Sequence, residues 1–424
     1  MNFNISQVIG LMNMKKYHES LNILNKLENE DKENFEILNL KGFIYLKLNK
    51  FVDSINYLTK ALAKKNRSFH TLCYRSGAYS EVGDYEKAVI DLKKAQKINP
   101  QSYDVYLTLG DAYSNLGEND KSIEFFLKSL ELKPNFDLAI EYLIKKIAEK
   151  NSFQKDENKI VKTNLLINKI NYKYSLSKNI EEDVIHSLFV ESNKIISENL
   201  KNLTTTQTQI FRRNDFNLNC DRHFRVFNNF KAIPNFCFSC FKVTVEVESV
   251  LDLIKLYLIF DNISLPNDNI RKCMIELRPN VQGTYKGFIY CRSLNEAKEV
   301  EILLSNILAK NIKDSPSPKL KKGCTEFSNK YPEYKNLENE IMDYNKDWEK
   351  FEDIVDKTFP KFKIYKKDER SIKGITLSDI LIIKNWLYFA RLIGDDSYKK
   401  ISNDKFINNK LKEKFLTKKN NLEN

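Results

Sequence analysis

Two short segments carry side chains of the kinds that bind metal ions or exchange electrons. Cys220 and His223 are separated by two residues in CDRH, and Cys237 and Cys240 are separated by two residues in CFSC. Zn²⁺ binds such a set of cysteines and histidine tetrahedrally, and the two-residue spacing lets one turn present both ligands of a pair. The sequence therefore offers one structural zinc site made of these four residues.

Two other interpretations compete with zinc. Phe236, Phe238 and Phe241 crowd the CFSC segment, where a metal knuckle usually has small residues, so the thiols could simply pack in a core. A redox pair would stand at the start of a helix that follows a strand. An alternating strand pattern follows CFSC instead, which disfavours redox chemistry. Zinc binding and plain thiol packing both stay open.

The sequence contains no other motif with a known catalytic mechanism. We find no glycine-rich phosphate loop, no nucleophile elbow and no HExxH, and an enzyme assignment lacks support. Seven cysteines and no signal-like N-terminal segment favour a reducing compartment, so we expect the cytoplasm. The longest apolar run, LIKLYLIF, is too short to span a membrane. An unfamiliar active site stays open.

The elements that position these residues must belong to more than one domain. A chain of 424 residues, 42% of them hydrophobic, exceeds one ordinary domain. The formal net charge is +12, and the excess lies outside the first 150 residues. Such a balance can indicate a polyanionic partner. Acidic residues are mixed with the basic ones throughout, however, which favours an ordinary solvated surface.

Residues 1–150 contain a repeat with a constant step of 34 residues. Tyr17, Phe51 and Tyr85 occupy one position in successive units, and Asn119 breaks it in the fourth. Each unit predicts two antiparallel helices, and small residues recur where the paired helices would cross. On the first helices these small residues are Gly42, Ser76 and Gly110, and on the second helices they are Ser54, Ala88 and Ser122.

This pattern resembles the tetratricopeptide repeat family, with repeats at residues 1–34, 35–68, 69–102 and 103–136 and a closing helix at 137–150. The resemblance implies a helical solenoid whose first helices line a groove for an extended peptide or a helix of a protein partner. The groove positions that it implies are Asn39, Phe43, Lys47, His70, Cys73, Gly77, Glu81, Asp104, Leu107, Asp111 and Asn115. These residues lack the Lys and Asn set with which one subclass binds a C-terminal carboxylate. The array could alternatively pack only against the rest of its own chain.

The remaining chain predicts a fold class of α plus α+β, a small ferredoxin-like domain with helices around it. Residues 151–209 form a helical connector, and the α+β domain covers 210–312, with strands expected in FKVTVEV, RKCMIELR and TYKGFIYCR. Helices are expected between the first two strands and after the third, an order typical of split βαβ domains. A linker at 313–323 precedes a helical region at 324–424 that ends in a polar tail.

Two features of the α+β domain could bind nucleic acid. Strand alternation places polar and aromatic residues on the sheet face away from the helices, and YKGFIY partly resembles the third-strand motif of the RNA-recognition fold. The residues of this possible nucleic-acid face are Lys242, Arg278, Lys286, Phe288, Tyr290 and Arg292. The segment IFRRNDFNLNCDRHFRVFNNF interleaves arginine with phenylalanine, which can contact phosphates and bases. The preferred interpretation is an irregular loop pinned by buried phenylalanines, with arginines paired to Asp215 and Asp221.

Together these features predict an intracellular adaptor whose repeat array recruits a protein partner. A nucleic-acid-binding protein and an unrecognised enzyme are the alternatives.

The zinc hypothesis predicts about one zinc ion per purified chain, because four-coordinate structural sites retain their metal tightly. Replacing one ligand in Cys237→Ser should then release the metal and destabilise the second domain while the array stays folded. Elemental analysis of the purified protein and of the variant measures the metal directly. A metal-free wild-type protein with normal stability would mean that the cysteines are packing residues.

Overall fold

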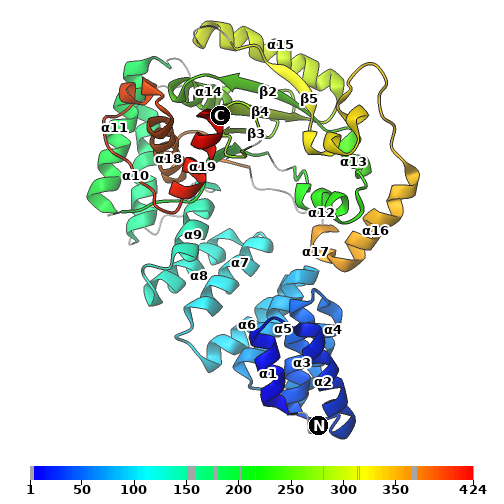
Figure 1. Cartoon of the computed structure of the whole chain (residues 1–424). Helices are drawn as coiled ribbons and strands as arrows, with labels where there is room; N and C mark the ends of the chain where they lie inside the picture. The colour runs from blue at the N-terminus through cyan, green and yellow to red at the C-terminus, as the bar shows by residue number, and fades with distance from the viewer. Residues whose placement is uncertain are drawn as a thin grey trace. The chain divides into compact units, whose positions relative to one another are not determined.

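The chain forms two compact units (Figure 1). The computed structural model describes residues 4–149, 158–174, 180–200, 202–214, 216–279, 281–312, 314, 316–363 and 370–423. Unit 1 comprises Met1–Leu143, Asn219–Val226 and Lys350–Tyr365. Unit 2 comprises Ile144–Leu218, Phe227–Glu349 and Lys366–Asn424. The division between Leu143 and Ile144 lies inside the helix α9, Asp137–Glu149.

Unit 1 contains the expected helix pairs. Their bounds are α1 Ile5–Asn13, α2 Tyr17–Glu30, α3 Phe35–Lys47, α4 Phe51–Lys64, α5 Phe69–Val82, α6 Tyr85–Ile98, α7 Tyr103–Asn115, α8 Asn119–Leu132 and α9 Asp137–Glu149. The residue that recurs every 34 positions is the first residue of α2, α4, α6 and α8. Two positions before it stands a residue with positive φ, at Lys15, Asn49, Gly83 and Gly117. A left-handed residue of this kind ends one helix and turns the chain into the next.

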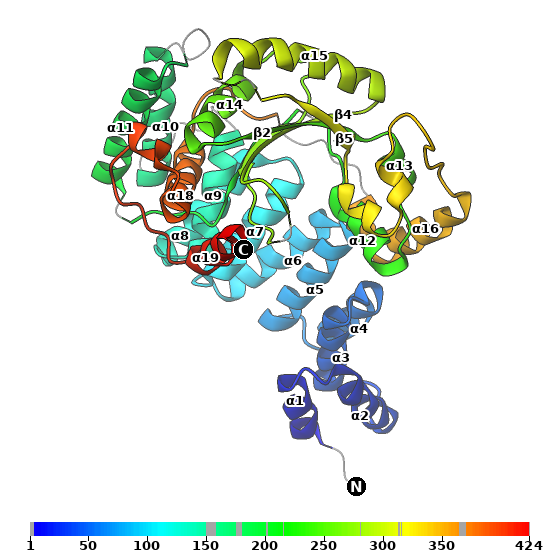
Figure 2. The same cartoon turned by 45° about the horizontal axis from the view of Figure 1, so that its top comes forward.

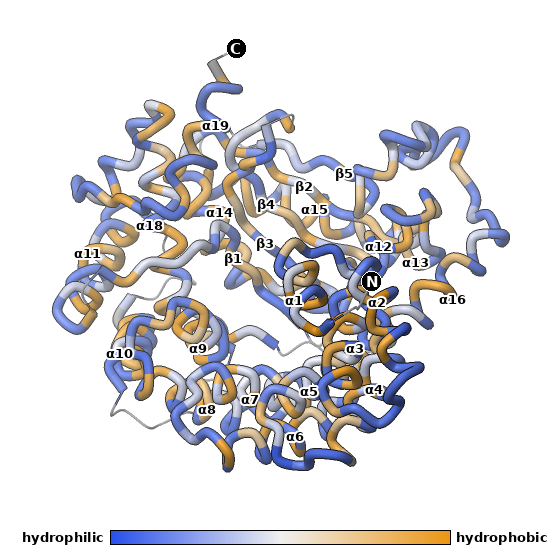
Figure 3. Tube along the Cα trace, turned by 60° about the horizontal axis from the view of Figure 1, so that its bottom comes forward, coloured by the Kyte–Doolittle hydropathy of each residue, from blue (hydrophilic) through white to orange (hydrophobic). Residues whose placement is uncertain are grey.

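Small residues let the paired helices approach closely, as the repeat predicts. Any Cβ on Gly42 would overlap the side chain of Leu58, and one on Gly110 would overlap the ring of Phe126. The Ser54 hydroxyl donates a hydrogen bond of 2.8 Å to the Gly42 carbonyl. The helices are amphipathic and carry both hydrophobic and hydrophilic residues along their length (Figure 3). The apolar sides form two core clusters, one from α1 to α3 and one from α4 to α7.

Unit 2 is built on a five-stranded antiparallel sheet with the order β1-β3-β4-β2-β5. The strands are β1 Gln209–Arg212, β2 Phe241–Val247, β3 Arg271–Ile275, β4 Tyr285–Cys291 and β5 Lys319–Lys322. Strands β2 to β5, with α14 Val250–Asn262 after β2 and α15 Leu294–Asn311 after β4, give the ferredoxin-like βαββαβ order. The fold class predicted from the sequence is therefore confirmed.

The segment 313–323, expected to be a linker, contributes the strand β5. Residues 319–322 pair with 241–244 of β2 at one edge of the sheet. Their sequence, KLKK, has only one apolar residue, and lysine-rich strands are typical of sheet edges. The four backbone pairs that define β5 depend on β2, which lies far away in sequence.

Both long helices of the α+β domain cover the same face of the sheet (Figure 2). The contact is close at Gly287 in β4, where an added Cβ would overlap Leu256 and Phe260 of α14. Val243 and Ile289 lie opposite each other in the register on this face and are fully buried. The alternation read from the sequence thus assigns this face correctly.

Further helices complete the described part of both units. They are α10 Lys159–Lys173, α11 Glu182–Asn199, α12 Cys220–Phe230, α13 Asn235–Phe238, α16 Glu349–Thr358, α17 Pro360–Lys363, α18 Leu377–Ile393 and α19 Lys412–Glu423, with 3₁₀ turns at Thr325–Asn329, Pro332–Lys335, Lys346–Trp348 and Asp396–Lys400. The apolar periodicity of residues 180–200 and of the segment from Ser378 predicts two helices, which are α11 and α18 in the structure. Trp386 of α18 is completely buried.

Two expectations for the C-terminal region are wrong. The pattern of residues 331–357 predicts one helix, but only residues 349–357 are α-helical, and they form nearly all of α16. Tyr331, Tyr334 and Tyr344 instead pack their rings against neighbouring aromatic side chains. The polar and basic composition of the tail from Lys399 predicts a solvated segment, but Phe415 of α19 is fully buried and contacts the ring of Phe389. Contacts with distant parts of the chain therefore determine the structure that both segments adopt.

Within the described residues, none of the helices combines the length and the apolar character needed to cross a membrane.

The close crossing at Gly110 gives a stability test. The variant Gly110→Leu should lower the free energy of unfolding of unit 1 by about 1–3 kcal/mol, because the new side chain overlaps Phe126 in a packed core. The matched control is Gly10→Leu on α1, where a Cβ meets nothing within 4 Å. Chemical denaturation followed by circular dichroism compares the two. Equal stability of both variants would contradict the tight crossing.

Candidate functional site

The eleven predicted groove positions lie on the first helices of three consecutive pairs, α3, α5 and α7. Lys47, His70 and Asp104 are exposed, and Leu107 is buried. The other seven are partly buried, and these are Asn39, Phe43, Cys73, Gly77, Glu81, Asp111 and Asn115. Ten of the eleven positions are therefore at least partly accessible, and Leu107 belongs to the core instead.

Aromatic rings on α3 and α5 form a continuous patch. The ring centroids of Phe43 and Tyr74 are 4.7 Å apart, and those of His70 and Tyr74 are 6.4 Å apart. The ammonium group of Lys47 lies 5.2 Å from the centroid of Phe43. We call Phe43, His70 and Tyr74 the aromatic patch. The sequence analysis missed Tyr74, although its position one helical turn after His70 was a usable signal.

Asn39 has a structural role between the same two helices. Its side-chain oxygen accepts a hydrogen bond of 2.8 Å from the hydroxyl of Thr71, which is completely buried. A buried hydroxyl needs such a partner, so Asn39 helps to fix α3 against α5. This use of the side chain reduces what Asn39 can offer a ligand.

Three of the predicted groove residues are acidic, and they are Glu81 on α5 and Asp104 and Asp111 on α7. Burial, with smaller contributions from Asp111 and Glu81, raises the pKa of Tyr85 to about 12. Burial, followed by the charge of Asp104, raises the pKa of Cys73 to about 11. The charges of these carboxylates thus add to the effect of burial at Cys73 on α5 and at Tyr85 on the second helix α6. We call Glu81, Asp104 and Asp111 the acidic group.

One member of the acidic group already has a cationic partner. The Lys361 ammonium of α17 forms an ion pair of 2.5 Å with the Glu81 carboxylate, and both residues belong to unit 1. Sequence analysis did not predict this contact, because 280 residues separate the two side chains and no periodicity links them.

The four candidate zinc ligands fall in two units. Cys220 and His223 are on α12 in unit 1, and Cys237 and Cys240 are at α13 in unit 2. In the part of the chain that the structure describes, no three or more His, Cys, Asp and Glu side chains are grouped to hold a metal ion. Cys237 and Cys240 are buried, as the packing interpretation expects. The zinc site stays a prediction for elemental analysis.

His223 lies in a strongly perturbed environment. The side chain is buried, and burial together with the neighbouring charge of Arg222 lowers its pKa to about 4. Its imidazole is therefore neutral near pH 7. A neutral ring fits a packed core and a metal ligand equally well.

The sheet face proposed for nucleic acid is mostly covered. Lys242, Lys286 and Phe288 are only 9%, 5% and 7% exposed. Tyr290 is partly buried, and Arg278 is held by ion pairs with Glu276 and Glu326. Arg292 is exposed and stacks on the ring of Phe216 at 3.7 Å. The predicted residues thus mostly serve contacts within unit 2.

Phe288 is the residue that base stacking would need, and its ring faces are occupied. The ammonium groups of Lys242 and Lys272 lie 5.4 and 5.3 Å from its centroid. A stacking platform must expose the face of its ring to the base. In this structure Phe288 is a core residue, so of Phe288 and Tyr290 only Tyr290 is partly accessible, and nucleic-acid binding by this face stays a prediction.

The segment that interleaves arginine with phenylalanine, residues 210–230, forms ion pairs, but with partners other than those expected. Arg212 pairs with Asp261 and Asp379, and Arg222 pairs with Glu352 and Asp356. The preference for paired arginines over phosphate contacts was correct for both. The expected partner Asp215 lies outside the described residues. The second half of the segment is the helix α12 and not an irregular loop.

Comparison with known proteins recognises the repeat region. The family model described as "Tetratricopeptide repeat" matches residues 72–102 and 103–136. No curated protein matches the chain. Similar solved structures include "Crystal structure of MamA", which is 23% identical, covers 35% of this chain and 85% of that chain, and has a TM-score of 0.33. Another is "Arabidopsis OM64 TPR domain", 23% identical, covering 26% of this chain and 93% of that chain with a TM-score of 0.26.

The buried lysine of the sheet face gives a stability test. Burial lowers the pKa of Lys242, so the charged ammonium is less stable in the folded protein than in the unfolded chain. The variant Lys242→Met should therefore raise the free energy of unfolding near pH 7 by about 1 kcal/mol, because it keeps the packing and removes the charge. The control is Lys319→Met, at an exposed position that pairs with Thr244.

The difference in unfolding free energy between the wild type and Lys242→Met should change with pH in a known direction. Between the lowered pKa and the usual value near 10.5, the unfolded chain binds the Lys242 proton more than the folded protein does. The stability of the wild type should therefore rise toward that of the variant as the pH rises. Urea denaturation at pH 7 and pH 10 measures the difference, and a destabilised variant at pH 7 would mean that the contacts of the Lys242 ammonium outweigh the cost of its burial.

Proposed function

The N-terminal third of the chain is a tetratricopeptide repeat array, and we propose that this array is a protein-binding module of a cytoplasmic adaptor. Its working surface is the predicted groove on α3, α5 and α7. The α+β domain of unit 2 supplies a second role to which we assign no activity. The observation that supports a binding role most directly is the combination of accessible aromatic and acidic side chains on the groove helices.

The aromatic patch would bind an apolar or aromatic side chain of the partner. Phe43 and Tyr74 are partly buried, so they are already held in place by the array and lose little freedom on binding. Aromatic residues fixed in this way commonly contribute most of the energy of a protein interface. His70 extends the patch toward solvent. The patch therefore favours a partner with one or more large apolar residues.

The acidic group would bind basic side chains of the same partner. Asp104 is exposed and Asp111 is partly buried, so basic side chains in the groove can approach them, whereas Glu81 is paired with Lys361. Charge complementarity of this kind raises the association rate and selects against acidic partners. A short peptide or helix that combines apolar and basic residues fits both surfaces. This combination defines the proposed partner class.

Charge reversal in the acidic group tests this function. Peptides are first selected from a random display library against the full chain, and their affinities are measured by fluorescence anisotropy. The variant Asp104→Lys/Asp111→Lys should lower the affinity for peptides that combine basic and aromatic residues at least tenfold at low salt, because it turns attraction into repulsion. The difference should shrink as the salt concentration rises.

The matched control places the same charge change on second helices. Asp53→Lys/Glu86→Lys reverses two exposed acidic residues of α4 and α6, outside the proposed groove. It should leave the affinities unchanged, and circular dichroism should show both variants to be folded. Equal weakening by both pairs would mean that only the net charge matters, and the groove assignment would then be abandoned.

A further inference from the structure

Part of the array surface in unit 1 is occupied by the protein's own chain. Residues 219–226, at the start of α12, and residues 350–363, in α16 and α17, belong to the same compact unit as the repeats. We call these two segments the clasp. Both are more than 70 residues beyond the last repeat in sequence, so neither is part of the repeat pattern.

The two segments of the clasp are strongly attached to each other. Arg222 donates hydrogen bonds of 2.6 and 3.0 Å to the two carboxylate oxygens of Asp356 and one of 2.8 Å to Glu352. All three side chains are largely buried, with 10–13% exposed. Paired hydrogen bonds between a guanidinium and a carboxylate are among the strongest polar contacts in proteins. The clasp can therefore move as one piece.

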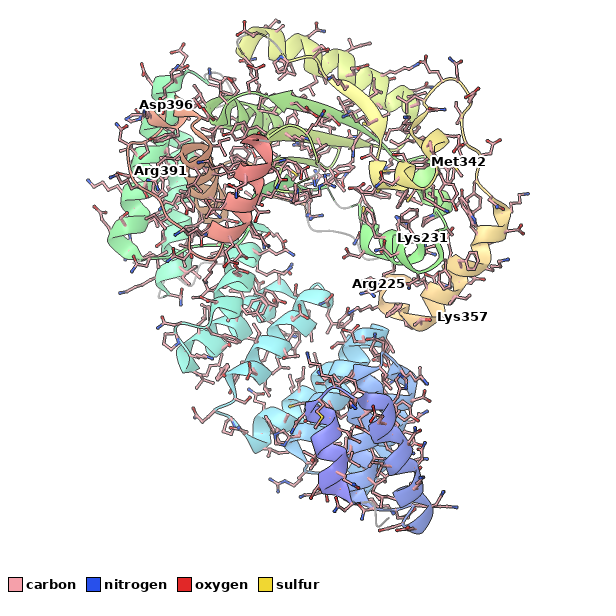
Figure 4. All side chains as sticks on the ribbon, viewed as in Figure 1. Arg225, Lys231, Met342, Lys357, Arg391 and Asp396 are labelled. Atoms are coloured by element: carbon pink, nitrogen blue, oxygen red, sulfur yellow. The ribbon has the colours of Figure 1, made fainter. Side chains whose placement is uncertain are left out.

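Aromatic contacts add to this attachment. The Arg225 guanidinium lies 4.5 Å from the ring centroids of both Phe359 and Phe362. The side-chain amide of Asn219 donates a hydrogen bond of 2.7 Å to the Phe362 carbonyl. Figure 4 labels Arg225 on α12 and Lys357 near the end of α16. These contacts present residues 359–363 in a fixed conformation.

The attachment of the clasp to the repeats rests on weaker contacts. Lys361 forms the ion pair with Glu81, and the two side chains are 23% and 36% exposed. The ring of Phe359 meets that of Phe51 edge-on, with centroids 6.2 Å apart. Partly exposed ion pairs and single ring contacts each stabilise a structure only slightly. The clasp is thus held firmly within itself and lightly by the array.

We propose that the surface around Phe51 and Glu81 is a docking site of the array, and that the clasp occupies it as a tethered competitor of an external protein segment. This proposal rests on the proposed function of the array as a binding module. The external segment carries an aromatic residue two positions before a lysine, as Phe359 and Lys361 do. The aromatic side chain meets Phe51, and the lysine meets Glu81.

The clasp also lowers the apparent affinity of the array for such a partner. A tethered segment has a high effective concentration at its own site, so an external segment binds only to the fraction of molecules in which the clasp is displaced. Glu81 is also a member of the acidic group. Displacement of Lys361 therefore makes the Glu81 carboxylate available to a basic partner that also approaches Asp104.

A peptide added in trans tests the docking site. The probe is the fluorescent peptide EKFEDIVDKTFPKFK, which reproduces residues 349–363. It is titrated against the wild-type full chain and against the full chain with Phe359→Ala/Lys361→Ala, in which the clasp has lost its contacts with the array. We expect at least tenfold tighter binding to this opened variant, because the competitor no longer fills the site.

Two controls separate docking from unfolding. Ile354→Ala/Lys357→Ala changes two exposed residues of α16 and should bind the peptide as the wild type does. Adding Glu81→Lys to the opened variant should abolish binding of the probe. A second peptide with glutamate at the position of Lys361 should then bind this variant, because the charge pair is reversed. Such restored binding cannot arise from a misfolded array.

The outcomes distinguish this proposal from the proposed function. If library peptides depend on Asp104 and Asp111 but bind the opened variant no better than the wild type, the docking site is overturned and the groove function stands. A probe that binds all variants equally also overturns it. A wild-type dimer that forms with rising concentration, detected by light scattering and absent in the opened variant, would show that a second copy of the chain is the occupant, which overturns the external partner.

Discussion

The ion cluster around Arg212 is the constraint on which the architecture of unit 2 depends. Arg212 is almost completely buried and pairs with Asp261 at the end of α14 and with Asp379 in the first turn of α18. Burial would lower the pKa of Arg212, but Asp379, Tyr257 and Asp261 outweigh that effect and raise it. One cation thus joins an edge strand to two helices. Removing it would leave two buried carboxylates uncompensated, which is costly.

The same cluster fixes the start of the most buried helix. Asp379 forms a capping box with Thr376 at the N-terminus of α18, and it also accepts hydrogen bonds from Arg212. Gly374 donates its backbone N–H to Asp261 and accepts from Arg212. The loop before α18, the cap and the first strand are therefore positioned by one network. Further along α18, Asn385 and Trp386 donate hydrogen bonds to backbone carbonyls of residues 205–208, so polar contacts also fix the middle of the helix.

Local patterns in the sequence predicted the elements whose residues repeat at short range. The step of 34 residues located each helix pair, and alternation assigned Val243 and Gly287 to the covered face of the sheet. The sequence analysis missed features that depend on distant partners. Strand β5 exists only through β2, and the pair Arg222–Asp356 joins residues 134 positions apart. Neither contact leaves a periodic signal in one sequence.

The candidate site follows the same division. The helices that carry the groove were predictable, whereas the burial of Leu107, the role of Asn39 and the ion pair of Glu81 depend on packing. On the sheet face, packing removed predicted binding residues from the surface. Its residue types suggest a ligand surface, yet Lys242 and Phe288 are covered. Residue type indicates what a side chain can do, and burial decides whether it is available.

The order of the clasp along the chain has a consequence for the protein as it is synthesised. The repeats are complete once residue 143 has been added, whereas Lys361 follows more than 200 residues later. At translation rates of roughly 5–20 residues per second, the array is present without the clasp for roughly 10–40 seconds. During that interval a nascent chain offers Phe51 and Glu81 to other proteins without internal competition. Under our proposal, the newly made protein therefore binds a partner without the competition that the clasp imposes on the finished protein.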